Sequence, residues 1–226
     1  MISLQRYYDE ILRYADLDNK RAVVMILRNL YNKGLITPRS GNVSFVSNNV
    51  DVMKKYGKVI WITPKGKPKI LVTEQDLVPV TIDGIPLSDL VPSTELPMHL
   101  LCYQRTNAKA LVHAHSPYTL LAAELEVLTD DNLKEYYETK YLIGSSVTII
   151  ERYEPGSEEL AVRVSEALSK SNIAVLLGHG VVAKGENPWV ALDRVEVLEM
   201  LSKILILKEL FKSLSSTYMG PSHSSL

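Results

Sequence analysis

Apolar residues follow helical spacing near both ends of the chain. Residues 2–15 and 19–34 each carry one apolar face, and Gly34 stands where the second pattern stops. In the second segment this face consists of Val23, Ile26, Leu27, Leu30 and Tyr31. A longer pattern of the same kind begins at Pro188 and continues to about Leu214. The pattern predicts two helices at the start of the chain and one long helix near its end.

Between about residues 40 and 87 the pattern changes to short β-branched runs. The runs lie in SGNVSFVS, VIWITPKGKPKI and DLVPVTIDGIPL, where Gly, Pro, Asn and Asp separate them. Turn-forming residues between short β-branched runs are typical of strands joined by tight turns. We therefore expect hairpins or a meander in this stretch.

In the second half of the chain, buried strand patterns alternate with helical ones. Helices are expected at about 94–106, 116–125 and 156–170, and strands at 109–115, 146–153 and 172–185, the last with a tight turn inside it. Ser116 with Pro117, and Ser157, are helix-start signals. No internal repeat, low-complexity tract or linker interrupts the chain. The mixture predicts a single α/β domain.

Composition fits a soluble globular protein and argues against several other classes. The chain has 226 residues, of which 46% are apolar and 23% charged, and its net charge is −1. A net charge this close to zero provides no excess of positive charge that would attract nucleic acid or an anionic membrane. The N-terminus lacks the apolar run of a signal peptide, and no run of about 18 uncharged apolar residues exists. We therefore expect a cytoplasmic protein, with the single cysteine, Cys102, as a small buried residue.

Two of the five histidines, His113 and His115, stand two residues apart in the motif HAH. On a strand, side chains two residues apart point to the same face. The pair falls at the carboxyl end of the strand expected at 109–115, where ligands commonly lie in α/β proteins. Two imidazoles on one face can begin a zinc site, which needs about three protein ligands when it is catalytic. The alternative is a pair of ordinary, partly buried histidines.

His179 is the best candidate for a third ligand. It stands between two glycines in LLGHGVV, directly after a buried strand pattern. Glycines allow unusual backbone angles and a close approach by other groups. The alternative is a turn histidine without a function.

Glu95 lies at the start of the helix expected at 94–106, in PSTELPMH. A glutamate there is most often a favourable partner of the helix dipole, and Ser93 or Thr94 can cap the helix. The functional alternative is an acid/base group beside a metal ion. His99 is four residues further on and shares the helix face of Glu95, where a structural role is the simpler interpretation.

Two glycine turns and one helix start have the features of anion sites. SGN, at 40–42, and PKG, at 64–66, place backbone amides in loops without bulky side chains. Side chains that add hydroxyl groups or positive charge beside them are Ser93, Thr94, Arg39 and Lys65.

Five motifs occur along the chain in a fixed order: SGNVSF, ITPKG, PSTELPMH, VHAHSP and GHGVVAKG. In this order and spacing the chain resembles the class II aldolase/adducin family, from about residue 7 to residue 210. The resemblance implies a single domain, here residues 1–214, with a central and mainly antiparallel sheet flanked by helices in three layers. It also implies a homotetramer with active sites between subunits.

The resemblance assigns roles to individual residues. Metal ligands fall on His113, His115 and His179, which would hold one zinc ion per subunit. The catalytic glutamate, which also touches the resting metal, falls on Glu95. The phosphate-binding positions fall on Gly41, Asn42, Lys65, Gly66, Ser93 and Thr94.

The activity that the resemblance implies is zinc-dependent cleavage of a ketose 1-phosphate, of the L-fuculose 1-phosphate type, to dihydroxyacetone phosphate and an aldehyde such as lactaldehyde. Glu95 would move the proton at the carbon beside the carbonyl, and a tyrosine from the adjacent subunit, Tyr137 or else Tyr136, would serve the aldehyde oxygen. Two alternatives stay open: a sugar-phosphate dehydratase of the methylthioribulose-1-phosphate type, and a non-enzymatic, adducin-like binding protein. The three histidines argue against the binding protein, because the adducin branch tends to lose them.

Some features depart from the family pattern or lie beyond it. Lys65 stands where the family often has Thr or Ser, and Thr94 where it often has Ser, so the bound anion can differ. The related epimerases carry Asp where Glu95 stands, which argues against epimerisation. The polar tail, 215–226, contains Tyr218 and His223 and is expected to be mobile until substrate binds, when Tyr218 would help to close the site.

Overall fold

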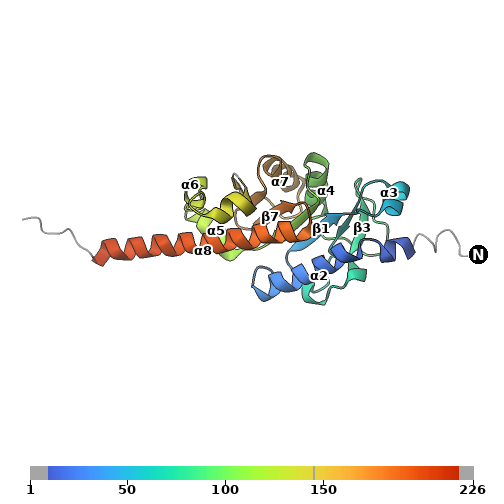
Figure 1. Ribbon diagram of the computed structural model, residues 1–226, viewed down its shortest axis with the longest axis horizontal. Coiled ribbons are helices and arrows are strands. Elements are labelled where there is room, and N and C mark those ends of the chain that lie inside the picture. The colour runs from blue at the N-terminus through green and yellow to red at the C-terminus, as the bar shows by residue number, and fades with distance from the viewer. Residues whose placement is uncertain (1–9, 145, 219–226) are drawn as a thin grey trace, which may run out of the picture.

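A seven-stranded sheet forms the centre of this computed structural model, which describes residues 10–144 and 146–218 (Figure 1). The strands are β1 (Asn42–Val46), β2 (Val59–Ile62), β3 (Val78–Thr81), β4 (Ala110–Ala114), β5 (Thr148–Ile150), β6 (Ile173–Leu176) and β7 (Gly180–Gly185). Their order across the sheet is β3-β2-β1-β4-β7-β6-β5. Neighbouring strands are antiparallel except for β5 and β6, which are parallel. The expectation of a mainly antiparallel sheet is confirmed.

Helices cover both faces of this sheet (Figure 1). On one face lie α2 (Leu17–Asn32), α5 (Pro117–Glu124) and α8 (Pro188–Tyr218), which share one apolar core with the strands. On the other face lie α4 (Leu96–Arg105) and α7 (Glu158–Lys170), which share a second core. Shorter helical segments in the connections are α3 (Val50–Tyr56), η1 (Lys69–Leu71), η2 (Glu74–Asp76), α6 (Asp130–Leu133) and η3 (Thr139–Ile143). The α/β class and the three layers are thereby confirmed.

Strand β4 shows how alternation along the sequence divides the two cores. Val112 and Ala114 belong to the core under α2, α5 and α8, whereas Leu111 belongs to the core under α4 and α7. His113 shares the face of Leu111, because side chains two residues apart on a strand point the same way. Its ring is therefore directed toward α4, the helix that Glu95 immediately precedes.

Most elements expected from the sequence pattern are present. The helix expected at 19–34 is α2, and Gly34 follows it with φ +71°. Of the earlier helix, residues 10–14 are helical and 1–9 lie outside the described residues. Ser157 caps α7 through its hydroxyl oxygen, which accepts a backbone hydrogen bond of 3.1 Å.

Two local features differ from the sequence interpretation. The pattern does not predict α3, whose only buried residue is Val52, because so short a helix shows no apolar stripe. It begins at Asn49, whose side chain accepts two backbone hydrogen bonds. Either Ser93 or Thr94 was expected to cap α4, but Glu95 occupies the cap position and no side chain caps this helix.

The last helix is longer than its pattern predicts. α8 continues to Tyr218 instead of ending at about Leu214, so residues 215–218 of the expected tail are helical. Its far end projects past the rest of the described chain in Figure 1. Within the described ranges, no helix combines the length and the apolar character needed to cross a membrane.

Candidate active site and metal centre

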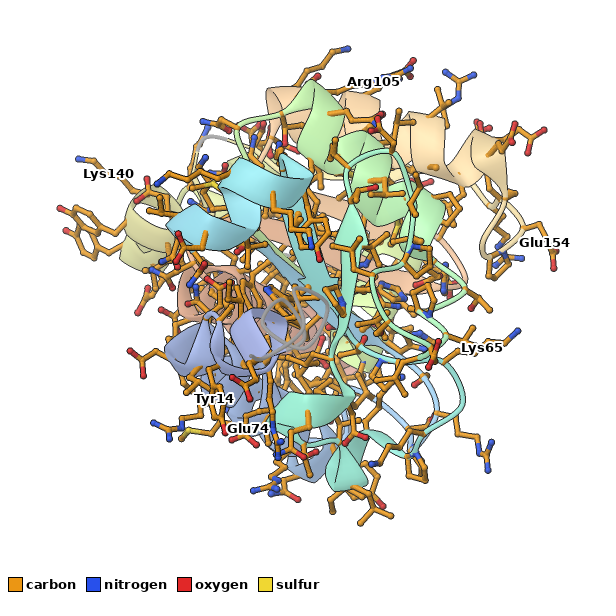
Figure 2. The ribbon with its side chains drawn as sticks, turned by 90° about the vertical axis from the view of Figure 1, so that its right-hand side faces the viewer. Tyr14, Lys65, Glu74, Arg105, Lys140 and Glu154 are labelled. Atoms are coloured by element: carbon orange, nitrogen blue, oxygen red, sulfur yellow. The ribbon has the colours of Figure 1, made fainter. Side chains whose placement is uncertain are left out.

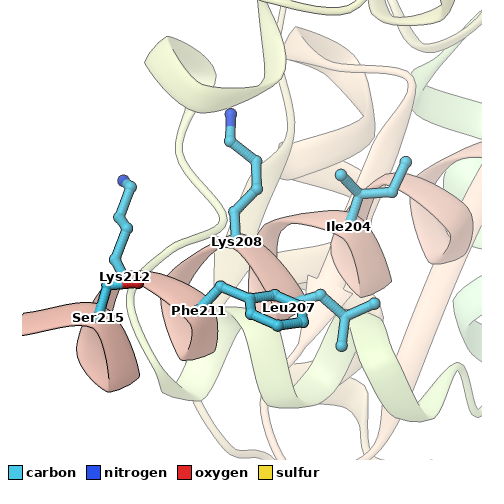
Figure 3. Close-up of a pocket in the computed structure, with 6 residues that line it drawn as sticks. All are labelled: Ile204, Leu207, Lys208, Phe211, Lys212 and Ser215. Atoms are coloured by element: carbon cyan, nitrogen blue, oxygen red, sulfur yellow. The ribbon is translucent and has the colours of Figure 1, made fainter. Parts of the chain in front are cut away.

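Most of the predicted site residues meet around a cavity of about 300 Å³ at the ends of the central strands β1, β4 and β7. Nine of them line it: Gly41, Asn42, Lys65, Gly66, Ser93, Thr94, Glu95, His115 and His179. Other hollows are larger, including one of about 650 Å³ along the far end of α8 (Figure 3). That hollow is lined by apolar and lysine side chains of one helix and contains none of the predicted residues. Size therefore does not mark the functional site here, whereas the gathering of chemically suited groups does.

The turn before β1 forms one side of the cavity and depends on glycine. Gly41 has φ +71°, and a Cβ atom added there would lie 2.4 Å from the Ile36 side chain and 3.0 Å from the His113 carbonyl oxygen. The turn is braced internally, because the Thr37 amide donates to Ser40 Oγ (2.7 Å) and the Ser40 amide donates to Thr37 Oγ1 (3.2 Å). A side chain at position 41 would push this turn away from β4, the strand that contains His113.

The second side of the cavity is formed by two segments that are bonded to each other. The Lys65 amide donates to the Val91 carbonyl (2.9 Å), and the Ser93 amide donates to the Thr63 carbonyl (3.0 Å). These bonds place the PKG turn beside the start of α4, although the two are almost thirty residues apart in the sequence. Lys65 and Thr94 are exposed here, and Figure 2 shows the Lys65 side chain extending from this face. The PKG turn and the residues just before α4 thus form this side of the cavity together.

Three histidines cluster beside the cavity, and two of them, His115 and His179, line it. His113 is the fourth residue of β4, His115 directly follows this strand, and His179 lies in the turn between β6 and β7. Their ring centroids are 4.7 to 5.3 Å apart, and one nitrogen atom from each lies within 4.8 Å of the others. The sequence hypothesis that HAH and GHG supply one three-histidine cluster is consistent with this geometry.

Gly180 explains how the turn that carries His179 comes so close to β4. A Cβ atom on Gly180 would lie 2.2 Å from the Ala114 carbonyl oxygen and 3.2 Å from the His113 ring. Gly178, on the other side of His179, has φ +71°, a conformation that favours glycine. The two glycines therefore allow β7 to pair with β4 while the histidine between them faces the cluster.

The histidine cluster offers ring nitrogens that a metal ion could bind. The Nδ1–H group of His113 donates to the Val181 carbonyl (2.9 Å), so its Nε2 atom carries the free lone pair. This Nε2 atom is buried and, among the described residues, has no hydrogen-bond partner. Burial lowers the pKa of His113, and burial together with the neighbouring histidines lowers the pKa of His115 to about 4. A second histidine nitrogen, His179 Nδ1, is likewise buried without a hydrogen-bond partner among the described residues, and ring nitrogens of this kind fit a zinc-type ion.

Glu95 reaches the cluster from the α4 side. Its Oε2 atom lies 3.2 Å from His113 Nε2 and its Oε1 atom lies 3.2 Å from His179 Nε2. Oε2 also accepts a hydrogen bond of 2.7 Å from the Asn42 side chain. Burial disfavours the charged form, but His113, His179 and Asn42 outweigh burial and hold the pKa of Glu95 well below its usual range. Glu95 is therefore an ionised carboxylate within reach of a metal ion and of a molecule in the cavity.

A chain of buried hydrogen bonds holds Asn42 in place behind Glu95. The oxygen of the Asn42 side chain contacts His99 Nε2, and His99 Nδ1 contacts Ser44 Oγ (2.6 Å). Ser44 Oγ in turn contacts the Tyr103 hydroxyl (2.7 Å). Because Asn42 donates to the carboxylate, its oxygen is the acceptor, so His99 must carry its proton on Nε2 and accept from Ser44 at Nδ1. His99, interpreted from the sequence as structural, is the fully buried centre of this chain.

The two tyrosines lie elsewhere, and two lining residues were missed. Tyr137 is 81% exposed, and neither it nor Tyr136 lines the cavity of its own chain. Lys69 and Pro155 do line the cavity. Sequence reasoning missed Lys69 because it is the third lysine of KGKPK, where nothing in the pattern distinguishes the buried one. Pro155 lies in the loop before α7, far along the chain from every motif used above.

Comparison with known proteins identifies the family. The model of the class II aldolase and adducin N-terminal domain matches residues 21–206. An L-fuculose phosphate aldolase of Methanocaldococcus jannaschii is 29% identical over 199 residues, which cover 86% of this chain and 99% of the relative. A 3-oxo-tetronate 4-phosphate decarboxylase of Haemophilus influenzae is 28% identical over 191 residues, covering 84% and 87%. A solved L-fuculose 1-phosphate aldolase is similar with a TM-score of 0.74 and 27% identity, covering 88% of this chain and 90% of that one.

These similarities extend over the whole domain and not only over the motifs. The matched residues 21–206 include both anion turns, Glu95 and the histidine cluster. The relatives include enzymes that make or break carbon–carbon bonds, and the chemical groups that such reactions need are assembled around one cavity. The chain belongs to the class II aldolase and adducin family, and it is one of the family's enzymes.

Proposed function

We propose that the chain is a zinc-dependent aldolase that cleaves a ketose 1-phosphate, of the L-fuculose 1-phosphate type, to dihydroxyacetone phosphate and an aldehyde such as lactaldehyde. The observation that carries this proposal is the position of Glu95 between two histidines of the cluster, at 3.2 Å from each, in the wall of a cavity whose other wall holds the anion turns. One cavity thus offers a place for a metal ion, an acid/base group and an anionic end group.

The residues divide the reaction among them. Cleavage breaks the bond between the carbon beside the ketone and the carbon that carries the next hydroxyl group, and the electron pair stays on the ketone fragment. A divalent metal ion bound by His113, His115 and His179 would supply Lewis acidity for that developing charge. In cleavage the hydroxyl group that becomes the aldehyde releases its proton, and Glu95, once protonated, delivers a proton to the carbon beside the ketone; in condensation both transfers run in reverse. Gly41, Asn42, Lys65, Gly66, Ser93 and Thr94 hold the phosphate, so that binding energy positions the reacting carbons.

We further propose that the working form is a homotetramer in which Tyr137 serves the site of a neighbouring subunit. The exposure of Tyr137 and its absence from its own cavity are consistent with this role. Mixed oligomers test it: subunits with Glu95→Gln and subunits with Tyr137→Phe, each inactive alone, should regain activity when they are refolded together. Absence of any recovery in oligomers shown to be mixed would refute the cross-subunit role, and Tyr136→Phe is the matched control.

A lid formed by the end of the chain is a separate proposal. Tyr218, expected in a mobile tail, is the last residue of α8. A closing segment could therefore begin only after the helix, and 219–226, with His223, lie outside the described residues. Truncation after Tyr218 should lower kcat while metal content and oligomeric state stay unchanged, because an uncovered site admits water. Unchanged kcat and KM in that variant would exclude a lid within 219–226.

A screen of ketose 1-phosphates tests the main proposal. Coupled detection of dihydroxyacetone phosphate should identify at least one substrate, with metal content of about one zinc per subunit. A 3-oxo-tetronate 4-phosphate should be included, because a relative of this chain is named as its decarboxylase and the same metal and acid/base groups could stabilise charge after loss of CO2. Release of CO2, or of water from methylthioribulose 1-phosphate, without dihydroxyacetone phosphate from any ketose would replace aldol cleavage by that reaction.

A further inference from the structure

Lys69 is a buried cation in the wall of the active-site cavity. The residue lines the cavity, yet it is only 3% exposed. Lysine is almost never fully buried without a partner, because removing its charge from water is costly. Among the described residues, Lys69 forms none of the ion pairs within 4.0 Å. A buried ammonium group without a contacting carboxylate is a feature that requires an explanation.

The position of Lys69 is fixed between the two anion turns. Its backbone amide donates to the Pro38 carbonyl (2.7 Å), which precedes the turn at Gly41. Its ammonium group donates to the Pro64 carbonyl (3.3 Å), at the start of the PKG turn. An ammonium group has three N–H donors, and this long bond engages one of them. Among the described residues the ammonium group forms no second hydrogen bond, so its other two donors stay available.

The charge around Lys69 favours an incoming anion. Burial lowers the pKa of the Lys69 ammonium group, and the Glu95 carboxylate opposes that shift through space. Arg39 and Lys65 also line the cavity, but both are exposed, so water screens their charges. A doubly charged phosphoryl group placed between the turns would give the buried ammonium group the counter-charge that the chain does not bring into contact with it.

We propose that Lys69 is a specificity-determining residue, which binds the phosphoryl end of the substrate directly and makes the enzyme discriminate against unphosphorylated sugars. The choice of phosphoryl ligand rests on the proposed function. The discrimination follows from burial: a neutral hydroxyl group at the same place leaves the buried charge uncompensated, whereas a phosphoryl oxygen forms a charge-assisted hydrogen bond with it.

If Lys69 had only a structural role, through its bond to Pro64, Lys69→Gln would bind phosphate as the wild type does. Lys69→Gln keeps an N–H donor near the Pro64 carbonyl and removes the charge, whereas Lys69→Met removes both. Lys67→Gln is the matched control, because Lys67 lies in the same loop, pairs with Asp76 at 2.6 Å and does not line the cavity. All three variants change the net charge by the same amount.

The experiment is calorimetric titration of the metal-loaded variants with inorganic phosphate and with dihydroxyacetone phosphate. Both Lys69 variants should bind either ligand about tenfold to a hundredfold more weakly than wild type, the range expected for one charge-assisted hydrogen bond, while Lys67→Gln binds as wild type does. Dihydroxyacetone, which has no phosphate, should bind to all the variants with the same affinity as to the wild type. Wild-type phosphate affinity in Lys69→Gln would overturn the proposal.

A second measurement keeps the outcome decisive if a Lys69 variant does not fold. In a crystal structure of the wild-type protein with inorganic phosphate, an oxygen atom of the anion should lie within hydrogen-bond distance of Lys69 Nζ, and phosphate bound only elsewhere would overturn the proposal. These experiments also distinguish a failure of the proposed aldolase activity from a failure of the proposed role of Lys69. If phosphate binding depends on Lys69 but no ketose 1-phosphate is cleaved, the activity is wrong and the anion site stands. If a ketose 1-phosphate is cleaved and Lys69→Gln binds phosphate normally, the proposed activity stands and the role of Lys69 is wrong.

Discussion

The two walls of the active-site cavity are built in different ways. The histidine wall is formed by strand ends and the start of α4, and Glu95 and His113 in it are buried and bonded to further buried groups. The anion wall is formed by turns, and Arg39, Lys65 and Thr94 in it are exposed. Rigid elements hold groups in place more precisely than loops do. The comparison indicates that the groups proposed for bond cleavage are preset, whereas the exposed members of the anion wall can vary without disturbing the fold.

Removal of the metal should have the largest effect, because it affects the preset wall as a whole. Treatment with a chelator should abolish turnover and lower Tm, since an ion that binds only the folded protein stabilises it. Addition of zinc should restore both, and a coupled assay with differential scanning calorimetry measures them. Activity that survives in protein shown by elemental analysis to be free of transition metals would contradict the assignment of the histidine cluster.

Glu95→Gln should have the next largest effect. Glutamine keeps the size of the side chain and a hydrogen-bonding oxygen, but it cannot accept and return a proton. We expect kcat to fall roughly 10²- to 10⁴-fold, while zinc content and Tm stay near their wild-type values. Turnover close to wild type would show that Glu95 acts only at the start of α4.

The two walls also differ in how far the sequence predicts them. Alternation on β4 indicated that His113 and His115 share a face, because strand geometry fixes which side chains point the same way. The glycines around His179 made it the best candidate for a third ligand, and the family resemblance supplied the complete set. The anion wall was predicted at its glycine turns but not at Lys69. The burial of Lys69 depends on contacts with Pro38 and Pro64, and such tertiary contacts leave no periodic signal in one sequence.

The same limit applies to the fold. The elements with an apolar stripe or a β-branched run were predicted, whereas α3 was not, since only Val52 of it reaches the core. The end of α8 was placed too early because the composition becomes polar after Leu214, although the helix continues. Polar composition alone does not end a helix when no glycine or proline intervenes. Local pattern thus predicts buried elements better than exposed extensions.

Substitution of His99 tests whether the preset wall extends behind Glu95. His99→Leu removes the donor to Asn42 and leaves the buried Asn42 oxygen unpaired, so we expect a loss of stability of about 1–3 kcal/mol. We also expect kcat to fall about tenfold, because Glu95 loses the fixed orientation that Asn42 provides. His99→Gln is the matched variant, since its amide nitrogen can still donate to Asn42. A purely steric role predicts equal kcat for the two variants once their folded fractions are equal.

Lys65→Ser should have the smallest effect, because it changes the adjustable wall at an exposed position. This substitution restores a residue type that the family often has there, and it leaves the Lys65 backbone bond to Val91 intact. Charge pairs in contact with water are worth about 0–1 kcal/mol and weaken further with salt. We therefore expect KM for the phosphorylated substrate to rise a few-fold with kcat unchanged, and the difference from wild type to shrink as ionic strength increases. A large fall in kcat, insensitive to salt, would mean that Lys65 becomes buried when substrate binds, and the anion wall would then be as preset as the histidine wall.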